Sequence, residues 1–457
     1  MMIINKIRAV IKNMNDDKDL MRAIYSSSQG QGEMRSAIND WALIYENSPP
    51  WDSKTLRKLN LGKAIAKELA RLVLLEAVFK STDRNIDAFL QSLLSEIRPH
   101  FEKAIAKGGM AIKPYVSGGK IKTDYVDAEN FFPTDYDQSG EITGAVFRTR
   151  LSQGGKFYTR LEKHIFDGSS EDITHAAYES GSRDMLGGRV PLERVSAWKG
   201  IAPHSVIRNI SAPLFAYFKV PFANTIDDSS PLGVSVYEEA IDLLEDADKQ
   251  YTSLLWEYEG GELAIDADID TLMGGDDYTE FSLPHGKKRL FRRCEGFKAN
   301  GEPFYHEFAP NLRDKAYTDG LETILRRVEF ASSLAYGTLS NVQNVDKTAE
   351  EIRSSKQRSY AAVSELQKTL GYTVERAAAA AAVWLNILGV QTEENSKVTF
   401  MWDDSIVRDP TREFSERLQL ISAGAYQPYE MRAWYFGEDE NEARKRCADE
   451  DDVEDIE

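Results

Sequence analysis

Cysteine and histidine are scarce in this chain of 457 residues, which contains two cysteines and six histidines. Cys294 and Cys447 lie far apart in the sequence, so a disulfide framework is not indicated and a reducing compartment is expected. The histidines form neither an HExxH motif nor a cluster with cysteine at zinc spacing. The sequence therefore predicts no bound metal and no cofactor.

Motifs that carry phosphate or nucleophile chemistry are also missing. The Gly118-Gly119-Lys120 segment is followed by Ile121, and Pro114 stands where a phosphate loop requires glycine. The sequence contains no G-x-S-x-G nucleophile elbow. We therefore expect a protein that is not an enzyme.

Long hydrophobic runs are absent as well. The longest, Ala377–Leu388, contains Asn386 and is shorter than the ~20 residues that a membrane-spanning helix requires. Near the N-terminus, Lys6, Arg8 and Lys12 interrupt the apolar residues, so they do not form the core of a signal peptide. The sequence predicts neither a membrane segment nor a membrane partner.

Basic residues are outnumbered, with 56 Lys and Arg against 74 Asp and Glu, which gives a net charge of -18. A nucleic-acid binder of high affinity needs a basic face that neutralises phosphates, so this balance argues against one. The balance is compatible with a protein along which nucleic acid slides. An apolar content of 42% is that of a globular protein, and the length predicts two to four domains.

The most informative stretch runs from Pro310 to Leu388. Apolar residues at helical spacing predict a first helix from about Leu312 to Tyr336, which Gly337 ends. A polar loop follows, and it consists of Thr338, Leu339, Ser340, Asn341, Val342, Gln343, Asn344 and Val345.

A second, very long helix is predicted after this loop. Thr348 and Glu351 form a capping box that marks its start. The helix contains no proline as far as Leu388 and would be ~60 Å long if it were straight. Gly371 is its weakest position, where we expect a kink or a break. A helix of this length suggests an assembly in which helices line or brace something extended.

The rest of the chain alternates between helical and β-rich parts. Helical spacing predicts helices at Leu59–Phe79 and Ile86–Lys107, and a period of two predicts strands between Met110 and Trp198. A loop-rich connection, Ile210–Gly233, precedes a helix over Val236–Tyr258. The later elements are a turn-rich insert (261–310) with strands near 262–269, 278–283 and 289–291, a strand at 397–402, short helices within 410–436, and an acidic tail (438–457) that we expect to be disordered.

The helix over Val236–Tyr258 carries an unusual excess of acidic residues. Between positions 234 and 260 there are eight acidic residues and one basic residue, Lys249. The predicted acidic face comprises Glu238, Glu239, Asp242, Glu245 and Asp246, and Asp248 is grouped with it.

Two charged clusters in the insert each allow two interpretations. Asp266, Asp268 and Asp270 alternate, so a strand would place them on one face, either as a divalent-metal site or as a solvated surface. The densest basic run is either a docking patch for a protein or nucleic acid or an ordinary solvated hairpin. It comprises Lys287, Lys288, Arg289, Arg292 and Arg293.

Several segments together resemble a known family. They are LFAYFKVPFAN at 214–224, SPLGVS at 230–235, GGMAIKP at 108–114 and VDAENFFP at 126–133. These segments, and the order of the predicted elements around them, closely resemble the portal proteins of tailed bacteriophages, in the subgroup of SPP1-like and A118-like phages. The resemblance covers nearly the whole chain.

The resemblance implies a portal fold, which is α+β and mainly α. Residues 1–233 and 346–410 would form the wing, 234–260 and 311–337 the two stem helices, and 261–310 the clip. Residues 338–345 would be the tunnel loop that projects towards DNA, and 346–388 a kinked wing helix in which Gly371 fits the kink. Residues 411–457 would form a short crown and an acidic tail.

The resemblance also implies the function and the partners. About twelve subunits would close into a ring at one capsid vertex, or thirteen when the protein is recombinant, with a channel for double-stranded DNA during packaging and ejection. The clip would bind the terminase large subunit and later the head-completion adaptor, and the ring would also contact scaffolding and major capsid proteins. It would assemble in the bacterial cytoplasm and remain in the virion. The alternatives are another structural virion adaptor, or a metal-dependent enzyme that uses Asp266, Asp268 and Asp270.

Overall fold

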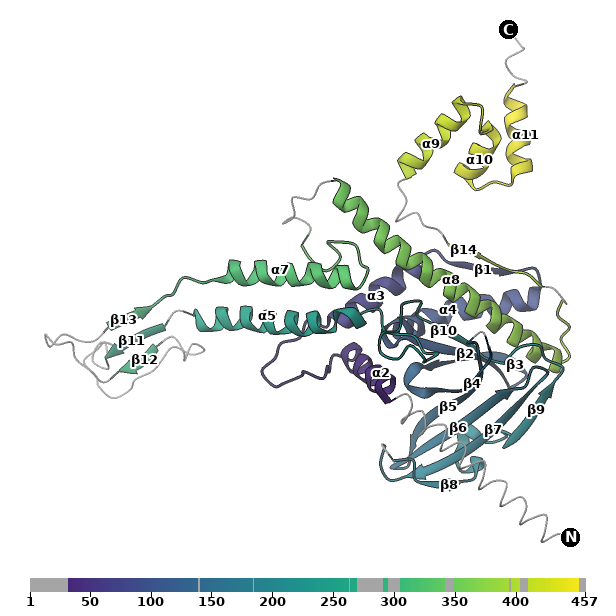
Figure 1. The fold of residues 1–457 in the computed structure, drawn as a ribbon, viewed down its shortest axis with the longest axis horizontal. Helices are drawn as coiled ribbons and strands as arrows, with labels where there is room; N and C mark the ends of the chain where they lie inside the picture. Colours follow the sequence, from purple (N-terminus) through teal and green to yellow (C-terminus); the bar gives the residue numbers. More distant parts are fainter. Residues whose placement is uncertain are drawn as a thin grey trace, which may run out of the picture. The chain divides into compact units, whose positions relative to one another are not determined.

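The computed structural model describes residues 32–138, 140–183, 185–262, 264–268, 291–294, 305–341, 349–393, 396–402 and 410–451 (Figure 1). Contacts divide these residues into two compact units. The first holds the described residues up to Phe400 apart from Leu75–Ala77, and the second holds those three residues and the described residues from Met401 onward. Helices and antiparallel strands occupy separate stretches of the chain, so the fold is α+β, as expected.

Three helices begin the described chain: α2 (Gly32–Tyr45), α3 (Leu61–Leu74) and α4 (Arg84–Lys107). The side chain of Asp83 caps α4 by accepting hydrogen bonds from the amides of Asn85 and Ile86. The helix ends at Gly108, whose φ of 88° is in the left-handed region that glycine tolerates. The prediction of a helix over Ile86–Lys107 is confirmed.

The predicted helix over Leu59–Phe79 is too long. The helix α3 ends at Leu74, and after a turn at residues 75–77 comes strand β1 (Val78–Ser81), which pairs with β14 (Val398–Met401). The ring of Phe79 is fully buried and meets the ring of Phe400 edge to face, with centroids 5.3 Å apart. The strand therefore depends on a partner more than 300 residues away, which local helical spacing cannot detect.

The β-rich region holds two antiparallel sheets. One has the order β4-β5-β6-β7-β8, with β9 also paired to β7, and the other has the order β10-β2-β3. Their bounds are β2 (Gly109–Ser117), β3 (Lys120–Asp127), β4 (Phe131–Tyr136), β5 (Ile142–Gln153), β6 (Lys156–Phe166), β7 (Ser170–Ser180), β8 (Gly188–Val190), β9 (His204–Arg208) and β10 (Ala216–Lys219). The predicted strands between Met110 and Trp198 are confirmed, and β10 lies in a stretch predicted to be loop.

The helices α5 (Ile241–Gly260) and α7 (Asp314–Ala331) pack side by side (Figure 1). Arg313 at the start of α7 donates three hydrogen bonds to Glu257 near the end of α5, through its amide, Nε and Nη2 at 3.0, 3.2 and 2.7 Å. The Nε2 of Gln250 also donates to the carbonyl of Tyr317 at 3.1 Å. These contacts fix the pair in an antiparallel arrangement.

Both helices are shorter than predicted. A short 3-10 turn, Glu238–Ala240, precedes α5, which begins five residues later than expected from the start predicted at Val236. The helix α7 was predicted to reach Tyr336 and stops at Ala331, because Ser333 adopts a left-handed φ of 57° and the amide of Leu334 donates to the carbonyl of Glu329.

The long helix α8 (Ala349–Ile387) has 39 residues and is therefore about 58 Å long. It packs on β2, β10 and α4. The expected break at Gly371 is absent, since the helix runs through this position, and a kink there stays a prediction. Gly371 is buried, and a Cβ added to it would lie 3.4 Å from Cδ2 of Phe400. A contact at this distance is an ordinary van der Waals contact, so packing against Phe400 does not require glycine at this position.

In the insert, β11 (Ala264–Asp268), β12 (Phe291–Cys294) and β13 (Tyr305–Phe308) form a small sheet of order β12-β11-β13. The strand predicted near 262–269 is confirmed, and the strand predicted at 278–283 lies outside the described residues.

The second unit contains α9 (Pro410–Ser422), α10 (Pro428–Phe436) and α11 (Glu440–Asp451). The first two were predicted as short helices. The expected disorder of the acidic tail is wrong as far as Asp451, because Glu440–Asp451 is helical. Glu440 and Glu442 lie in its first turn, where the helix dipole favours negative charge. Within the described parts of the chain, every helix is too short or too polar to cross a membrane.

Candidate functional site

Residues 332–341, which follow α7, lead into the predicted tunnel loop, and we call them its root. Residues 338–341 of that loop are described, and Val342, Gln343, Asn344 and Val345 lie outside the described residues. The carboxylate of Glu329 is fully buried. Its Oε1 accepts hydrogen bonds from the amides of Gly337, Leu339 and Ser340 at 3.1, 2.6 and 2.8 Å, and its Oε2 accepts one from Oγ of Ser340 at 2.9 Å.

Two further contacts hold the same root. The Oε2 of Glu322, two turns earlier on α7, accepts a hydrogen bond from the amide of Asn341 at 2.8 Å. From α8, the Nη2 of Arg358 donates to the carbonyl of Leu334 at 3.3 Å. The guanidinium of Arg358 also lies 4.5 Å from the ring centre of Phe330 and 5.1 Å from that of Tyr336. The turn between α7 and the loop is thus held from both helices.

The predicted acidic face divides into two groups. Glu239, Asp242 and Asp246 are exposed, and the partly exposed Glu245 pairs with Lys249 at 2.7 Å. Glu238 is half-buried and accepts a hydrogen bond from the indole of Trp41, and burial raises the pKa of this carboxyl. Glu239, Asp242 and Asp246 therefore present their negative charge to the surroundings of this subunit.

Asp248 does not belong to the acidic face with which the sequence grouped it. It is buried, and it accepts hydrogen bonds from Nε1 of Trp51 at 3.1 Å and from the amide of Leu59 at 2.8 Å. Burial raises the pKa of Asp248. Sequence reasoning missed the contact of Asp248 with the loop that carries Trp51. The only signal was the tryptophan itself, which follows Pro49-Pro50 in a polar loop and indicates that this loop packs against another part of the protein.

The segments that carry the family resemblance join α4 to α5. The amide of Val220 donates to the carbonyl of Gly108 at 3.1 Å, and that of Val236 donates to the carbonyl of Ile105 at 3.0 Å. A Cβ on Gly108 would lie 2.3 Å from the carbonyl oxygen of Gly233, and one on Gly233 would lie 2.2 Å from that of Gly108. Only glycine at both positions allows this approach of the two backbones.

The charged clusters of the insert are only partly described. Asp266 and Asp268 lie on β11 and Arg292 and Arg293 on β12, and the parallel register places Asp266 opposite Arg292. Asp270, Lys287, Lys288 and Arg289 lie outside the described residues. Within the described part of the chain, no three acidic, histidine or cysteine side chains form a group that could hold a metal ion.

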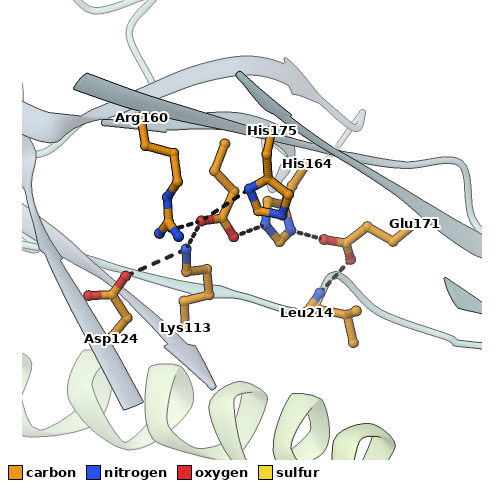
Figure 2. A network of polar contacts seen from close by, with 8 residues as sticks. Lys113, Asp124, Arg160, His164, Glu171, His175 and Leu214 are labelled. Atoms are coloured by element: carbon orange, nitrogen blue, oxygen red, sulfur yellow. Dashed lines mark hydrogen bonds and ion pairs between the residues drawn. The ribbon is translucent and has the colours of Figure 1, made fainter. Parts of the chain in front are cut away.

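A buried polar network between the two sheets is a second candidate site (Figure 2). Glu162 lies at its centre: its Oε2 is 2.7 Å from Nζ of Lys113, and its Oε1 is 2.8 Å from Nε2 of His164. The other ring nitrogen of His164, Nδ1, meets Oε1 of Glu171, whose Oε2 accepts a hydrogen bond from the amide of Leu214 at 2.6 Å.

This network does not have the form of an acid-base site. Burial lowers the pKa of His164, but the hydrogen bonds to Glu162 and Glu171 outweigh that effect and leave the pKa raised. Each ring nitrogen of His164 faces a carboxylate oxygen, so neither is open to a further partner. Burial alone would raise the pKa of Glu162, but the charge of Lys113 together with the hydrogen bond and the charge of His164 outweighs that effect and holds the pKa well below its ordinary value. The arrangement joins the sheet to the segment at Leu214 and is structural.

Comparison with known families decides the class of protein. The model of the family described as "Phage portal protein, SPP1 Gp6-like" matches residues 93–455, which is most of the chain. The chain belongs to this family. The matched part begins within α4 and includes the β-rich region, the paired helices α5 and α7, the root of the loop, and α8. A comparison with curated proteins gives no match.

Membership in the portal family confirms the resemblance found in the sequence and identifies a phage portal protein with a structural role. The residues that hold the loop root were not among the sequence-predicted site residues. Glu329 follows the apolar positions Leu325 and Val328 on the same helix, and an acidic residue beside such a stripe was the only available signal.

Proposed function

We propose that about twelve copies of this portal-family chain close into a ring at one capsid vertex, and that double-stranded DNA passes through its centre during packaging and ejection. The observation that supports this proposal is the family match over residues 93–455. In this proposal the chain performs no catalysis, and the energy for translocation comes from the terminase.

We assign the parts of the chain by the same family likeness. The antiparallel pair α5 and α7 would be the stem, the insert 261–310 the clip, and residues 338–345 the tunnel loop. The wing would contain the β-rich region and α8, and residues 411–457 would form a short crown. A ring needs contacts between unlike faces of neighbouring subunits. Trp256 and Phe330, which are 63% and 58% exposed on α5 and α7, are apolar groups suited to such contacts.

Electrostatics supports the exposed acids of α5 as a channel wall. Duplex DNA carries one negative charge per ~1.7 Å of its axis, and a basic wall would hold it by releasing counterions. Glu239, Asp242 and Asp246 are exposed carboxylates on one helix segment, repeated in every subunit of a ring. Such a wall repels DNA and allows it to slide.

Negative-stain microscopy of the purified full-length chain tests the proposal. We expect rings of about twelve subunits with a central hole. An electron cryo-microscopy map of the same rings that resolves side chains should place Glu239, Asp242 and Asp246 on the channel surface. Particles without a pore, or a map in which these three carboxylates lie away from any pore, would contradict the assignment.

The basic run of the insert is proposed as the docking patch for the terminase large subunit and the head-completion adaptor. Changing Lys287, Lys288 and Arg289 to Glu should slow association by about 10- to 1,000-fold at low salt, because charge complementarity accelerates encounter by such factors. Surface plasmon resonance with immobilised rings would measure the rate. The matched control reverses three exposed lysines elsewhere, Lys120, Lys122 and Lys199. Equal rates for both triple variants would leave the run as an ordinary solvated hairpin.

A further inference from the structure

We propose that Glu329 is a positioning residue for DNA passage: its buried carboxylate holds residues 337–340 against α7 and thereby fixes the point from which the tunnel loop departs. This inference rests on the proposed function of that loop. It adds a residue that lies outside the loop and outside the acidic face.

The first step is the chemistry of the carboxylate. A buried charge is unfavourable unless its oxygens are hydrogen-bonded. Glu329 meets this condition with donors from one short segment, since the amides of Gly337, Leu339 and Ser340 converge on Oε1 and the Ser340 hydroxyl occupies Oε2. Hydrogen bonds to a charged acceptor are about twice as strong as neutral ones, so this one side chain determines the conformation of the segment.

The second step is direction. Glu322 and Glu329 are two helical turns apart and therefore lie on one face of α7. The first accepts from the amide of Asn341 and the second from those of Gly337, Leu339 and Ser340, so the chain runs back along the helix from Gly337 to Asn341. The two carboxylates guide the chain as far as Asn341.

The third step is the support behind the hydrogen bonds that Glu329 accepts from residues 337–340, which we call the clamp. Arg358 of α8 contacts Phe330, the Leu334 carbonyl and Tyr336, which lie between Glu329 and the clamped segment. A force applied to the loop by moving DNA would thus pass into α7 and α8 instead of unfolding the turn. Without the Glu329 carboxylate, three amides lose their acceptor while the helices themselves remain packed.

Hydrogen exchange on assembled full-length rings tests the clamp directly. For Glu329→Ala, the amides of Gly337, Leu339 and Ser340 should exchange about 10- to 100-fold faster, because each loses a hydrogen bond to a charged group. Glu329→Gln keeps the shape and one acceptor oxygen and should show a smaller increase of about threefold to tenfold. The control is Glu375→Gln, an exposed glutamate on α8, which should leave these rates unchanged.

Packaging in complemented phage supplies the functional readout. The Glu329→Ala subunit should still form rings, with unchanged exchange in β5–β7, while DNA-filled heads fall about tenfold, equivalent to roughly 1.4 kcal/mol in a rate-limiting step. If the Glu329→Ala subunit does not form rings, hydrogen exchange and the yield of DNA-filled heads are measured on the Glu329→Gln subunit instead. Unchanged exchange at Gly337–Ser340 would overturn the clamp, and faster exchange with a normal yield of filled heads would overturn its role in DNA passage. If deletion of the loop itself leaves packaging normal, the proposed loop function fails, and the exchange result still decides the clamp.

Discussion

Replacing His164 with leucine is expected to lower the free energy of unfolding by about 3–5 kcal/mol, the usual result of removing one partner from a buried ion pair. His164 is 2% exposed and lies between Glu162 and Glu171. Of the two contacts of the fully buried Glu171 that Figure 2 draws, leucine at position 164 would leave only the hydrogen bond from the Leu214 amide. Guanidinium denaturation followed by tryptophan fluorescence would measure the loss.

The matched control is His204→Leu. His204 is exposed and pairs with the equally exposed Asp172 at 2.8 Å, so its loss should cost no more than about 1 kcal/mol. If both substitutions have the same effect, the buried network contributes no more than a surface pair.

The pH dependence has a definite sign. The pKa of His164 is raised above 6.5, so its contribution is complete below about pH 6.5 and is lost as the pH rises through the folded-state pKa. His175 behaves in the opposite way. Burial lowers its pKa to about 4, so the unfolded chain binds a proton at this residue before the folded protein does, and the free energy of unfolding decreases as the pH falls from about 6.5 to 4. The pKa of Glu162 lies well below 4.5, so its contribution is lost only below pH 4.5. The difference between wild type and His164→Leu should therefore narrow as the pH rises above 6.5.

The sequence could predict the elements that depend on local signals. A left-handed glycine at position 108 and a capping aspartate at 83 delimit α4, and both are visible in the chain as it is written. The change from helical spacing to a period of two after Met110 likewise predicts the strands of the two sheets. The family resemblance depended on segments such as 230–235, whose Gly233 is required by a backbone contact with Gly108.

The sequence could not show which of the acidic side chains point into the protein and which point into solvent. Glu238, Asp242 and Asp248 looked alike on one acidic helix, yet two of the three accept hydrogen bonds from tryptophans that lie 197 positions earlier in the chain. The same limit concealed Glu329. Helical spacing identifies an apolar stripe, but it cannot reveal that a carboxylate beside that stripe will meet three amides of the following turn. Such partners arise only from tertiary packing, so single-sequence reasoning treats these acids as solvated.

Deleting Asn341–Gln343 should separate ring formation from DNA passage. The deletion lies in the proposed tunnel loop and begins beyond Ser340, so the hydrogen bonds of Glu329 to Gly337, Leu339 and Ser340 remain. Rings should therefore assemble. If the loop guides or retains DNA, DNA-filled heads should fall by about tenfold or more, since a change of only about 1.4 kcal/mol in the limiting step is sufficient.

The control for this deletion removes the same number of residues from an exposed loop of the β-rich region, Gly181–Arg183. Counting filled and empty heads by electron microscopy, together with ring formation by size-exclusion chromatography, distinguishes the outcomes. Normal filling by the Asn341–Gln343 deletion would remove the loop from the DNA path and leave the acids of α5 as the proposed wall. Loss of rings in that variant alone would instead assign the segment to contacts between subunits. The deletion removes the Asn341 amide that donates to Glu322, but the hydrogen bonds of Glu329 to Gly337, Leu339 and Ser340 precede the deleted residues. Hydrogen exchange at these three amides, unchanged from wild type, would show that the segment they hold is intact and that a defect in filling comes from the deleted residues.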